Sequence, residues 1–592
     1  MRVELLGAIN YDKLASYMDK RVEGIVRDNN SMLDYITLLS NNNLCTEENV
    51  SLIDDVINYL SISDTETMSS YVEALKNIKE SFYKSREDLR DAVGWFKKII
   101  TEQNEYLANL KNDAVAAVKQ LEKDRRSAVV AAAGQLSHFH GKVFEFLEKI
   151  EGNSLEKNAR VAANICELGH NSITDHDYCL FAVEDISVMM EQILIEERYS
   201  SFTIKSRREV NFADAGFYVN DFHDVDGNII KDNEKAKQEF IDHINWLFGR
   251  YSFFIENGVA KEDARFVLPY NFNSNFFMGF DAHVLKDVII KFTKTRFSLI
   301  QEAREFGEKL YEIAKEHIPY IIPEIDATPV NLNDDVRNYI LDNIGNNEYE
   351  IIDKPKLISA SSNIDDTILT SAIMRKTQLP YKEARKVYKR VSSDNTEFRT
   401  KLMELLFKNG DANELAQVGF VFQIPISYAV LTHYTRHRTH PILIPEFAPN
   451  VDLYKFKIPP AIDANPELRD KFVDVFTMND YQHGRFRDIY GIREEDLVYF
   501  TLSGNMVNIV TRLDGKTMKH ISSLRECTRA QWESRNIARG LHDEVGKVKG
   551  AELFSSNLGP LCETHGICKE GKKSCGKVLA LQKKKETEEE SN

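Results

Sequence analysis

The fold of this chain is decided by one stretch that occurs twice, as GVAKEDARFVLPYNFNSNFFMGFDAHVLKDVIIKF at residues 258–292 and as GIREEDLVYFTLSGNMVNIVTRLDGKTMKHISSLR at residues 491–525. The two stretches align without a gap. They share a glycine, an acidic pair and a later aspartate: Gly258 with Gly491, Glu262 and Asp263 with Glu495 and Asp496, and Asp281 with Asp514. Upstream, GHNSITDHDYCLFAVEDIS (169–187) aligns with GDANELAQVGFVFQIPIS (410–427). The sequence therefore predicts two tandem copies of one domain.

The chemically active side chains do not follow this duplication. At several aligned positions one copy has an arginine or a histidine and the other has a residue that cannot replace it: Arg265 with Val498, Arg525 with Phe292, and His176 with Gln417. This pattern indicates either one working site shared between two repeats or a site that is being lost.

Size and composition place the chain among multidomain globular proteins. It has 592 residues, and 43% of them are hydrophobic, which is ample for sizeable cores. The formal net charge of −16 disfavours nucleic acids and anionic membranes as partners, because neither attracts an acidic surface. No apolar run reaches transmembrane length, the opening residues lack the layout of a signal peptide, and the seven cysteines do not resemble a secreted disulfide framework. We therefore expect a soluble cytoplasmic protein with no membrane partner.

Changes in sequence character divide the chain into five parts. MRVELLGA is typical of a short strand, and the long charged segments after it carry apolar residues at helical spacing. Later, KLISAS repeats the opening strand and ILTSAIMRKTQ repeats the small-residue helix AVVAAAGQLSHF. The predicted parts are an opening strand plus helical insertion (1–125), a first repeat (126–322), a linker (323–355), a second repeat (356–556) and a Cys-containing tail (557–592). The end of that tail, LALQKKKETEEESN, has the composition of a disordered segment.

A basic segment stands out in this acidic chain at residues 434–440, YTRHRTH, directly after the apolar segment PISYAVLTHY. Arg436, His437 and Arg438 put two guanidinium groups beside a titratable ring at a helix end, which suits a phosphate or a flavin pyrophosphate. His433 and His437 also have the i, i+4 spacing of a metal pair. The glutamate of a metalloprotease helix is absent between them, and the arginines would repel a divalent cation. The segment therefore favours an anion site over a metal site or a solvated basic face.

The first copy has its own polar segment at the equivalent place, EERYSSFTIKSRREVNF (196–212). Arg198, Ser201, Ser206 and Arg208 offer two guanidinium groups and two hydroxyls, which suffice for a phosphate monoester. The two arginine-containing segments thus occupy corresponding positions in the two copies.

With these motifs the chain resembles the flavin-dependent thymidylate synthases, fused as a tandem pair. The signature of that family runs Arg-His-Arg, two residues, Ser, one residue, Asn-Glu, one residue, Ser, one residue, Arg-Tyr. The second repeat matches the start of the signature with Arg436, His437 and Arg438. The first repeat matches the third arginine again, with Arg198, and three later positions, with Ser201, Ser206 and Arg208. Neither repeat keeps the Asn-Glu pair.

Three further segments carry the resemblance. GHNSITDH resembles the family's Gly-His-Glu-Ser box, DARFVLP its Ala-Arg-x-Val-Leu-Pro segment, and SLRECTRAQWESRNIA its Leu-Arg … Ala-Gln-Trp-Glu-Ile-Arg block. The resemblance covers roughly residues 127–322 and 356–575. It implies an α+β fold in which helices surround an antiparallel sheet in each repeat, with the long helical insertion added at the N-terminus.

The resemblance also implies site residues. Arg525 would be the catalytic arginine that holds and polarises the uracil of dUMP. The other residues that it implies bind dUMP (Arg198, Ser201, Ser206, Arg208, Arg265) or FAD (His176, His433, Arg436, His437, Arg438, Asp514, Lys516, His520). Because sites in this family lie where subunits meet, the two repeats would share one composite site.

The implied reaction is the reductive methylation of dUMP to dTMP, in which methylenetetrahydrofolate provides the carbon, NADPH reduces FAD, and the protein supplies positioning and electrostatics. Family members are homotetramers, so a tandem fusion predicts a dimer that acts as a pseudo-tetramer. Two alternatives stay open. One is a noncatalytic paralogue that keeps flavin or nucleotide binding, which the lost Asn-Glu pair favours. The other is flavin- and folate-dependent methylation of uracil in another substrate.

The tail contains three cysteines in LCETHGICKEGKKSC, and a fourth follows Arg525. Cys527, Cys562, Cys568 and Cys575 predict a structural zinc site that pins the tail to the core. The spacing is not that of paired Cys-x-x-Cys motifs, so free surface thiols remain the alternative.

Overall fold

We describe the fold from a computed structural model of the chain, which describes residues 1–5, 11–41, 57, 66–81, 86–344, 350–409, 412–446 and 452–581. The chain forms two compact units. The first holds Met1–Glu4, Tyr178–Glu312 and the chain from Glu324 onward, and the second holds Leu5–Asp177 and Ile313–Pro323. None of the described helices is both long and apolar enough to cross a membrane.

The first unit contains two four-stranded sheets with the same strand order. One sheet runs β1 (Arg2–Leu5), β2 (Tyr178–Ser187), β4 (Asn273–Asp281), β3 (Ser200–Ile204), and the other runs β5 (Lys356–Ala360), β6 (Gly419–Ser427), β8 (Met506–Asp514), β7 (Ile442–Leu443). The pairs β2–β4, β3–β4, β5–β6, β6–β8 and β7–β8 are antiparallel. Along β4 the buried side chains of Phe276, Met278 and Phe280 alternate with more exposed ones, as a sheet with one covered face requires. The predicted α+β fold with antiparallel sheets is confirmed.

The gapless repeat of the sequence is also a repeat of structure. α9 (Lys261–Ala264), the 3-10 turn Arg265–Val267, β4 and α10 (Ala282–Lys294) recur in the same order as α20 (Glu494–Leu497), the turn Val498–Phe500, β8 and α21 (Gly515–Arg525). The shared aspartates are helix N-caps, since Asp281 accepts from the Val284 amide at 2.8 Å and Asp514 from the Thr517 amide at 2.7 Å. The shared glycines, Gly258 and Gly491, have φ of 81° and 66°, where a β-carbon would be strained.

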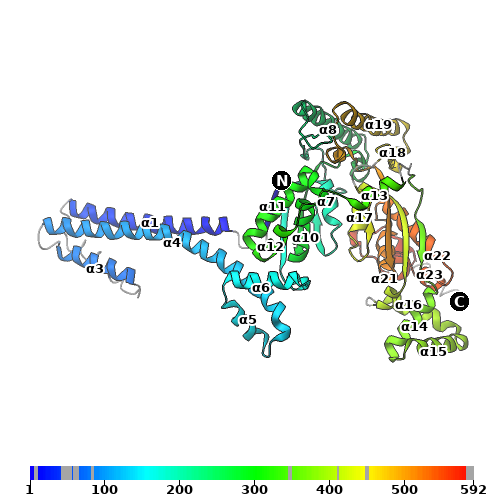
Figure 1. Cartoon of the computed structure of the whole chain (residues 1–592), viewed down its shortest axis with the longest axis horizontal. Coiled ribbons are helices and arrows are strands. Elements are labelled where there is room, and N and C mark those ends of the chain that lie inside the picture. Colours follow the sequence, from blue (N-terminus) through cyan, green and yellow to red (C-terminus); the bar gives the residue numbers. More distant parts are fainter. Residues whose placement is uncertain are drawn as a thin grey trace. The chain divides into compact units, whose positions relative to one another are not determined.

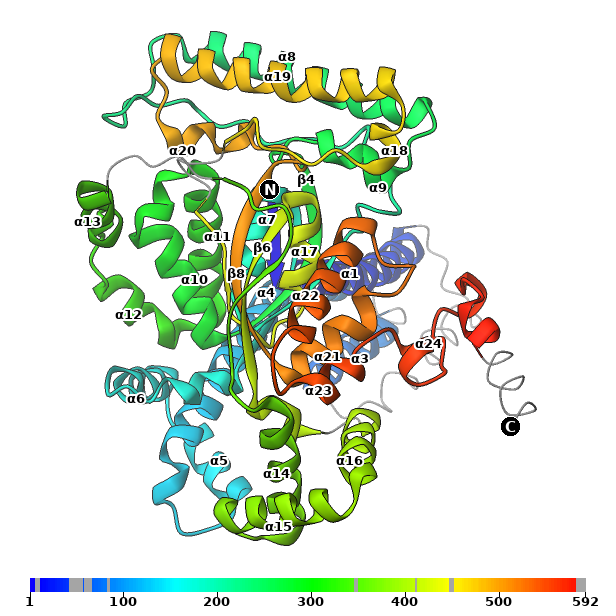
Figure 2. The same ribbon diagram turned by 90° about the vertical axis from the view of Figure 1, so that its right-hand side faces the viewer.

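The two repeats pack against each other through aromatic rings, since Phe222 and Phe240 of the first repeat both contact Phe486 of the second. The long helices α8 (Asn233–Glu256) and α19 (Pro466–Ile489) lie side by side in both views (Figure 1, Figure 2). His243 on α8 bonds to the side chain of Asn479 on α19 at 2.9 Å, and Asn479 donates to the Phe500 carbonyl at 2.7 Å. The Gly504 amide donates to the Phe266 carbonyl at 2.7 Å, so backbone also bonds to backbone across the repeats.

Serine-capped helices follow β2 and β6. These are α7 (Val188–Ile195) and α17 (Tyr428–Thr435), whose caps Ser187 and Ser427 are held by the buried carboxylates of Glu302 and Glu533. The other helices are α11 (Gln301–His317), α12 (Ile322–Ala327), α13 (Asp335–Ile344), α14 (Ile364–Thr377), α15 (Tyr381–Asp394), α16 (Thr396–Lys408), α18 (Pro460–Asp463), α22 (Trp532–Gly546), α23 (Glu552–Ser556) and α24 (Leu561–Thr564).

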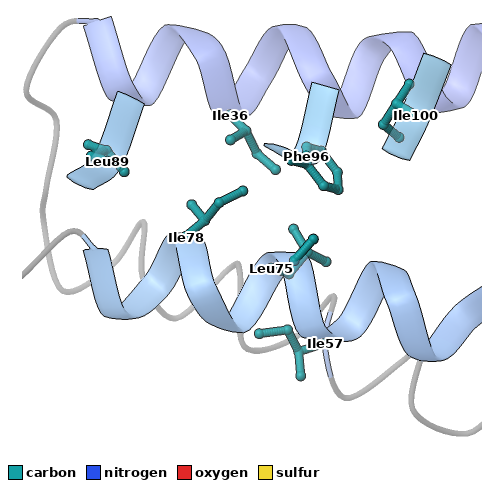
Figure 3. Packing of buried hydrophobic residues seen from close by; sticks show 8 residues of the cluster. Ile36, Ile57, Leu75, Ile78, Leu89, Phe96 and Ile100 are labelled. Atoms are coloured by element: carbon teal, nitrogen blue, oxygen red, sulfur yellow. The ribbon is translucent and has the colours of Figure 1, made fainter. Parts of the chain in front are cut away.

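The second unit is helical. α1 (Tyr11–Asn41) and α3 (Glu66–Ser81) pack on α4 (Arg86–Gln135) around a core that includes Ile36, Leu75, Ile78, Phe96 and Ile100 (Figure 3). The small-residue segment AVVAAAGQ is not a separate helix, because it forms the last turns of α4. There its buried alanines pack with Phe146 and Ile150 of α5 (Val143–Glu151). α6 (Leu155–Glu167) and the 3-10 turn Asn171–His176 complete the unit.

The predicted linker is more structured than its composition suggests. It contains most of α12 and all of α13, and Asp334 caps α13 by accepting from the Arg337 amide at 2.8 Å. Asn508 of β8 holds the stretch before β5, accepting from the Ile352 amide at 3.2 Å and donating to the Glu350 carbonyl at 2.7 Å. Residues 582–592, predicted to be disordered, lie outside the described residues.

Candidate functional site

Five arginines from both repeats lie together in the first unit, and we call them the arginine cluster: Arg207, Arg208, Arg265, Arg436 and Arg525. The first two follow β3, the third opens the turn after α9, the fourth ends α17 and the last ends α21. Burial and then the charges of Arg207 and Arg208 lower the pKa of Arg265 to about 10. Partial desolvation and Arg207 likewise lower the pKa of Arg436. Because like charges disfavour one another at short range, these shifts mark a strongly cationic place.

Among the residues that the structure describes, two members of the arginine cluster have a carboxylate partner. Arg207 donates to Glu191 at 2.6 Å, and Arg208 donates through Nε to Glu262 at 2.7 Å. In the described part of the chain, no carboxylate oxygen lies within 4.0 Å of the guanidinium groups of the other three, Arg265, Arg436 and Arg525. The cluster therefore carries an excess of positive charge.

Arg265 shows that excess most clearly. It is only 3% exposed, its Nε donates to the Glu262 carbonyl at 3.2 Å, and its Nη2 is buried without a hydrogen-bond partner. A buried cationic donor with no partner is costly, and an anionic ligand would remove that cost.

Two neutral histidines of the second repeat set the orientation of Arg525. Burial and then the neighbouring arginines hold the pKa of His433 far below its usual value, and burial followed by Arg525 lowers the pKa of His437 to about 3. Neutral His437 accepts from Arg525 Nε at 3.2 Å, and the His433 carbonyl accepts from Arg525 Nη2 at 2.9 Å. The buried Nδ1 of His433 has no hydrogen-bond partner. Both imidazole rings are thus neutral at pH 7. The Arg525 guanidinium is held by the His433 carbonyl of α17 and by the His437 ring that follows this helix.

A second group of polar residues, which we call the serine–histidine patch, joins the repeats through Arg438. Arg438 donates to the Ser200 carbonyl and, at 3.0 Å, to Ser201 Oγ. Burial and then Arg198 lower the pKa of His440 to about 4, and His440 Nδ1 bonds to Thr511 Oγ1 at 2.7 Å. His440 Nε2 and Arg198 Nη2 are both buried without a hydrogen-bond partner. The patch, made of Arg198, Ser200, Ser201, Arg438 and His440, therefore also has unused polar atoms.

The other predicted site residues have varied surroundings. The Ser206 hydroxyl accepts from the Arg208 amide at 3.4 Å, so it lies beside the arginine cluster. The His520 ring lies 5.2 Å from that of His437. Asp514 caps α21, as described above, and Lys516 donates to Asn413 at 2.9 Å. His176 ends a 3-10 turn in the second unit.

Comparison with known proteins identifies the family. The sequence model of the family described as "Thymidylate synthase complementing protein" matches residues 118–320 and again residues 356–549. The chain belongs to this family.

Curated relatives carry the name flavin-dependent thymidylate synthase. The protein from Clostridium tetani is 27% identical over 205 residues, which span 31% of this chain and 79% of the relative. The protein from Geobacter sulfurreducens is 31% identical over 142 residues (24% of this chain, 58% of the relative), and that from Pyrococcus furiosus is 28% identical over 196 residues (31% and 77%). The predicted membership in the flavin-dependent thymidylate synthase family is confirmed, and two matching regions agree with a tandem duplication. The roles of individual residues stay predictions.

The four thiols predicted to bind zinc line one small cavity of about 90 Å³. Cys568 donates to Ser574 Oγ at 3.4 Å, and Cys527, Cys562, Cys568 and Cys575 are all free. Among the residues that the structure describes, no group of three or more His, Cys, Asp or Glu side chains is arranged to hold a metal ion. The four thiols as zinc ligands stay a prediction.

Sequence reasoning missed three residues around the arginine cluster. Arg207 stands at an unspecified position of the family signature, between Ser206 and Arg208. Trp532 donates from its indole to Asp263 of the other repeat at 2.8 Å. Glu191 is the single charged residue of α7, VMMEQILI, in which every residue is buried. A lone acid on such a helix needs a partner, and that was the signal available in the sequence.

Proposed function

We propose that this chain is an FAD-dependent thymidylate synthase that converts dUMP to dTMP at a site shared by its two repeats. Methylenetetrahydrofolate would provide the carbon and NADPH the reducing equivalents. The observation that carries the proposal is the group of arginines from both repeats that have no carboxylate partner, Arg265, Arg436 and Arg525. A nucleotide phosphate carries close to two negative charges at neutral pH and would offset them.

The phosphate of dUMP would be bound by groups of the first repeat. Ser206 offers a hydroxyl, Arg208 a partly exposed guanidinium, and Arg265 the buried Nη2 that lacks a partner. Arg198 and Ser201 are better suited to the flavin, because the extended strand β3 separates Ser201 from Ser206 by roughly 16 Å. This assignment divides the predicted nucleotide ligands between two subsites.

Arg525 would act on the uracil. Its Nε and Nη2 are already engaged by His437 and His433, which leaves Nη1 to donate to the pyrimidine ring. A guanidinium that is fixed before the reaction stabilises negative charge developing on the ring without the cost of reorganisation. The neutral state of His437 matters here, because a protonated ring could not accept from Arg525.

The residues present fit a flavin. Among the described residues, the serine–histidine patch has two buried polar atoms without hydrogen-bond partners, on Arg198 and His440. Its Arg438 is an exposed cation, as is Arg436 of the arginine cluster. Guanidinium groups suit a pyrophosphate. Nε2 of neutral His440 can only accept a hydrogen bond, because the Thr511 hydroxyl donates to the Pro441 carbonyl and therefore accepts from His440 Nδ1. FAD bound there would supply the redox chemistry. The side chains of the patch would hold the phosphates of FAD and exclude competing reactions.

The test is turnover by the Arg525→Ala variant. We expect this variant to fold and to bind flavin, but to lose at least 100-fold in dTMP formation and in dUMP-dependent reoxidation of reduced flavin with methylenetetrahydrofolate. Arg539→Ala is the matched control, because Arg539 is an exposed arginine on α22 and should leave turnover unchanged. Ordinary turnover by Arg525→Ala would contradict the proposal.

A noncatalytic, nucleotide-binding paralogue is the second candidate. It is favoured by two predicted flavin contacts that are engaged elsewhere, since Asp514 caps α21 and Lys516 bonds to Asn413. Under this alternative the wild-type protein would bind dUMP, form no dTMP from it and methylate no uracil in a uridine-containing oligonucleotide.

A further inference from the structure

A buried acid that the family signature does not provide for is bonded to the arginine cluster through Arg207. Glu191 lies on α7 with no exposed surface, and its carboxylate is used on both sides. One oxygen accepts from Arg207 at 2.6 Å, and the other accepts from the hydroxyl of Ser274 on β4. Glu191 is thus a fixed point between a helix, a strand and the segment after β3.

Only the first repeat has this acid. Ser187 and Ser427 are equivalent caps of α7 and α17, so the residue that corresponds to Glu191 in the second repeat is Leu431, which is fully buried. The acid is therefore not a requirement of the shared fold. It belongs to the one copy whose Arg208 and Arg265 face the arginines of the second repeat.

Arg207 is the means by which Glu191 acts on its surroundings. It stands between Ser206 and Arg208, and its side chain is 10% exposed. This segment has no regular secondary structure, and its backbone forms a turn through the bond from the Val210 amide to the Ser206 carbonyl at 3.1 Å. Holding the Arg207 side chain further restricts the backbone on both sides of it. The two buried charges, with a second hydrogen bond to the carboxylate from Ser274, form a pair that specifies one geometry.

We propose that Glu191 is a positioning residue for the nucleotide phosphate: through Arg207 it fixes the Ser206–Arg208 segment so that its hydroxyl and guanidinium meet the phosphate beside Arg265. The inference rests on the proposed function for the identity of the ligand. In both repeats the Asn-Glu pair of the signature is replaced, by Thr203 and Ile204 in the first and by Leu443 and Ile444 in the second. Glu191 returns one carboxylate to the site from a different element.

Positioning and simple charge balance predict opposite results for Glu191→Gln. If the carboxylate only offset positive charge, its removal would tighten the binding of a dianion. If it positions the segment, dUMP should bind at least tenfold more weakly, while deoxyuridine, which lacks the phosphate, should bind as it does to the wild type. The measurement is isothermal titration of the full chain with dUMP and with deoxyuridine, followed by kcat and KM for dUMP. We expect KM to rise at least tenfold with kcat within threefold of wild type.

Two further variants keep the test decisive if Glu191→Gln folds poorly. In Glu191→Gln/Arg207→Gln both buried charges are removed together, so folding should be largely restored, and dUMP should still bind at least tenfold more weakly. Recovery of wild-type dUMP binding by this double variant would overturn the positioning role. Glu302→Gln is the matched control, because Glu302 is an equally buried acid that holds the N-cap of the same helix, Ser187, at 2.5 Å and 2.7 Å and has no bond to Arg207 among the described residues. It should leave the affinity for dUMP unchanged.

The outcomes separate this inference from the proposed function. Wild-type protein that binds dUMP but forms no dTMP would refute the synthase activity and leave the role of Glu191 to be decided by the titrations. Wild-type protein that does not bind dUMP would refute both. Unchanged or tighter binding of dUMP by Glu191→Gln, in a protein that forms dTMP, would refute the positioning role alone.

Discussion

Replacing Arg265 with methionine should stabilise the ligand-free protein while it abolishes tight nucleotide binding. Arg265 is 3% exposed and has no carboxylate partner within the described residues, so its charge is unfavourable in the absence of an anion. Burial first, and then Arg207 and Arg208, lower its pKa from 12.5 to about 10. That difference corresponds to about 3 kcal/mol against the charged form in the folded state.

The sign follows from linkage. A base whose pKa is lower in the folded than in the unfolded protein is destabilising at every pH below its folded value, and the penalty disappears only as the pH rises above about 10. The penalty is therefore fully present at pH 7. Methionine has a similar length and no charge, so it removes the penalty and loses the hydrogen bond to the Glu262 carbonyl, which is worth about 1 kcal/mol. The net expectation is a gain of about 2 kcal/mol in the free energy of unfolding.

The assay is thermal unfolding with and without saturating dUMP. Wild-type protein should show a clear rise in Tm with dUMP, because a ligand that binds the folded state stabilises it. Arg265→Met should start at a higher Tm and show little or no rise. A variant that melts lower than wild type and keeps the dUMP-induced rise would refute the view that Arg265 is a strained cation awaiting a phosphate.

Two further predictions concern acid stability and the contact between the repeats. Because burial and Arg525 lower the pKa of His437 from 6.5 to about 3, the unfolded chain binds a proton between these pH values that the folded chain does not, so stability falls as the pH drops below 6.5. In urea unfolding, the free energy of unfolding should fall less between pH 7 and pH 5 for His437→Asn than for the wild type, by about 2 kcal/mol. An identical pH dependence of the two proteins would contradict the shifted pKa. Gly504→Ala should lower the free energy of unfolding by about 1–3 kcal/mol, because its β-carbon would lie 2.8 Å from the Phe266 carbonyl oxygen and 2.7 Å from the Phe476 ring. Gly484→Ala is its control, since nothing lies within 4 Å of that β-carbon on the exposed side of α19, and it should gain about 0.5–1 kcal/mol. Equal changes in the free energy of unfolding of these two variants would show that the close contact at Gly504 does not exclude a β-carbon.

The fold was predictable because the two copies of the domain align without a gap over residues 258–292 and 491–525. Residues that fix the backbone geometry recur at aligned positions of the two copies. They are the turn glycines Gly258 and Gly491 and the helix N-caps Asp281 and Asp514, so the helices and strands next to them recur as well. The end of the helical insertion was less predictable. Charged and small-residue segments are both good helix formers, so nothing in the sequence separates them, and α4 continues through both.

The site was predictable only in part, because a motif lists residues and does not show the distances between them. Arg208, Arg265 and Arg525 do lie in one cluster, as their electrostatic effects on each other and on His433 indicate. Ser201 was grouped with Ser206 by the signature, yet an extended strand carries them to different partners. Glu191 escaped notice because a helix of buried residues is first assigned to the core, and its partner Arg207 follows 16 positions later in the chain.

At the aligned positions, one set of residues is cationic and the other set is apolar and buried. A fused pair of repeats can therefore keep the arginines in one place and replace them with packed apolar residues in the other. Val498 and Phe292, which correspond to Arg265 and Arg525, are both buried, and Phe292 packs edge-on against Phe306 with the ring centroids 6.1 Å apart. Next to Val498, Tyr499 donates to the buried Glu302 of the first repeat at 3.0 Å. Apolar contacts and a satisfied carboxylate stabilise the protein without a ligand, whereas unpartnered arginines do so only when an anion is bound. In a homo-oligomer every site must carry that cost, but fusion lets each copy change independently, so one set of arginines suffices for binding and the second place can contribute to stability. The asymmetry therefore argues for selection on the remaining cluster, since uniform decay would have replaced the buried and costly Arg265 first.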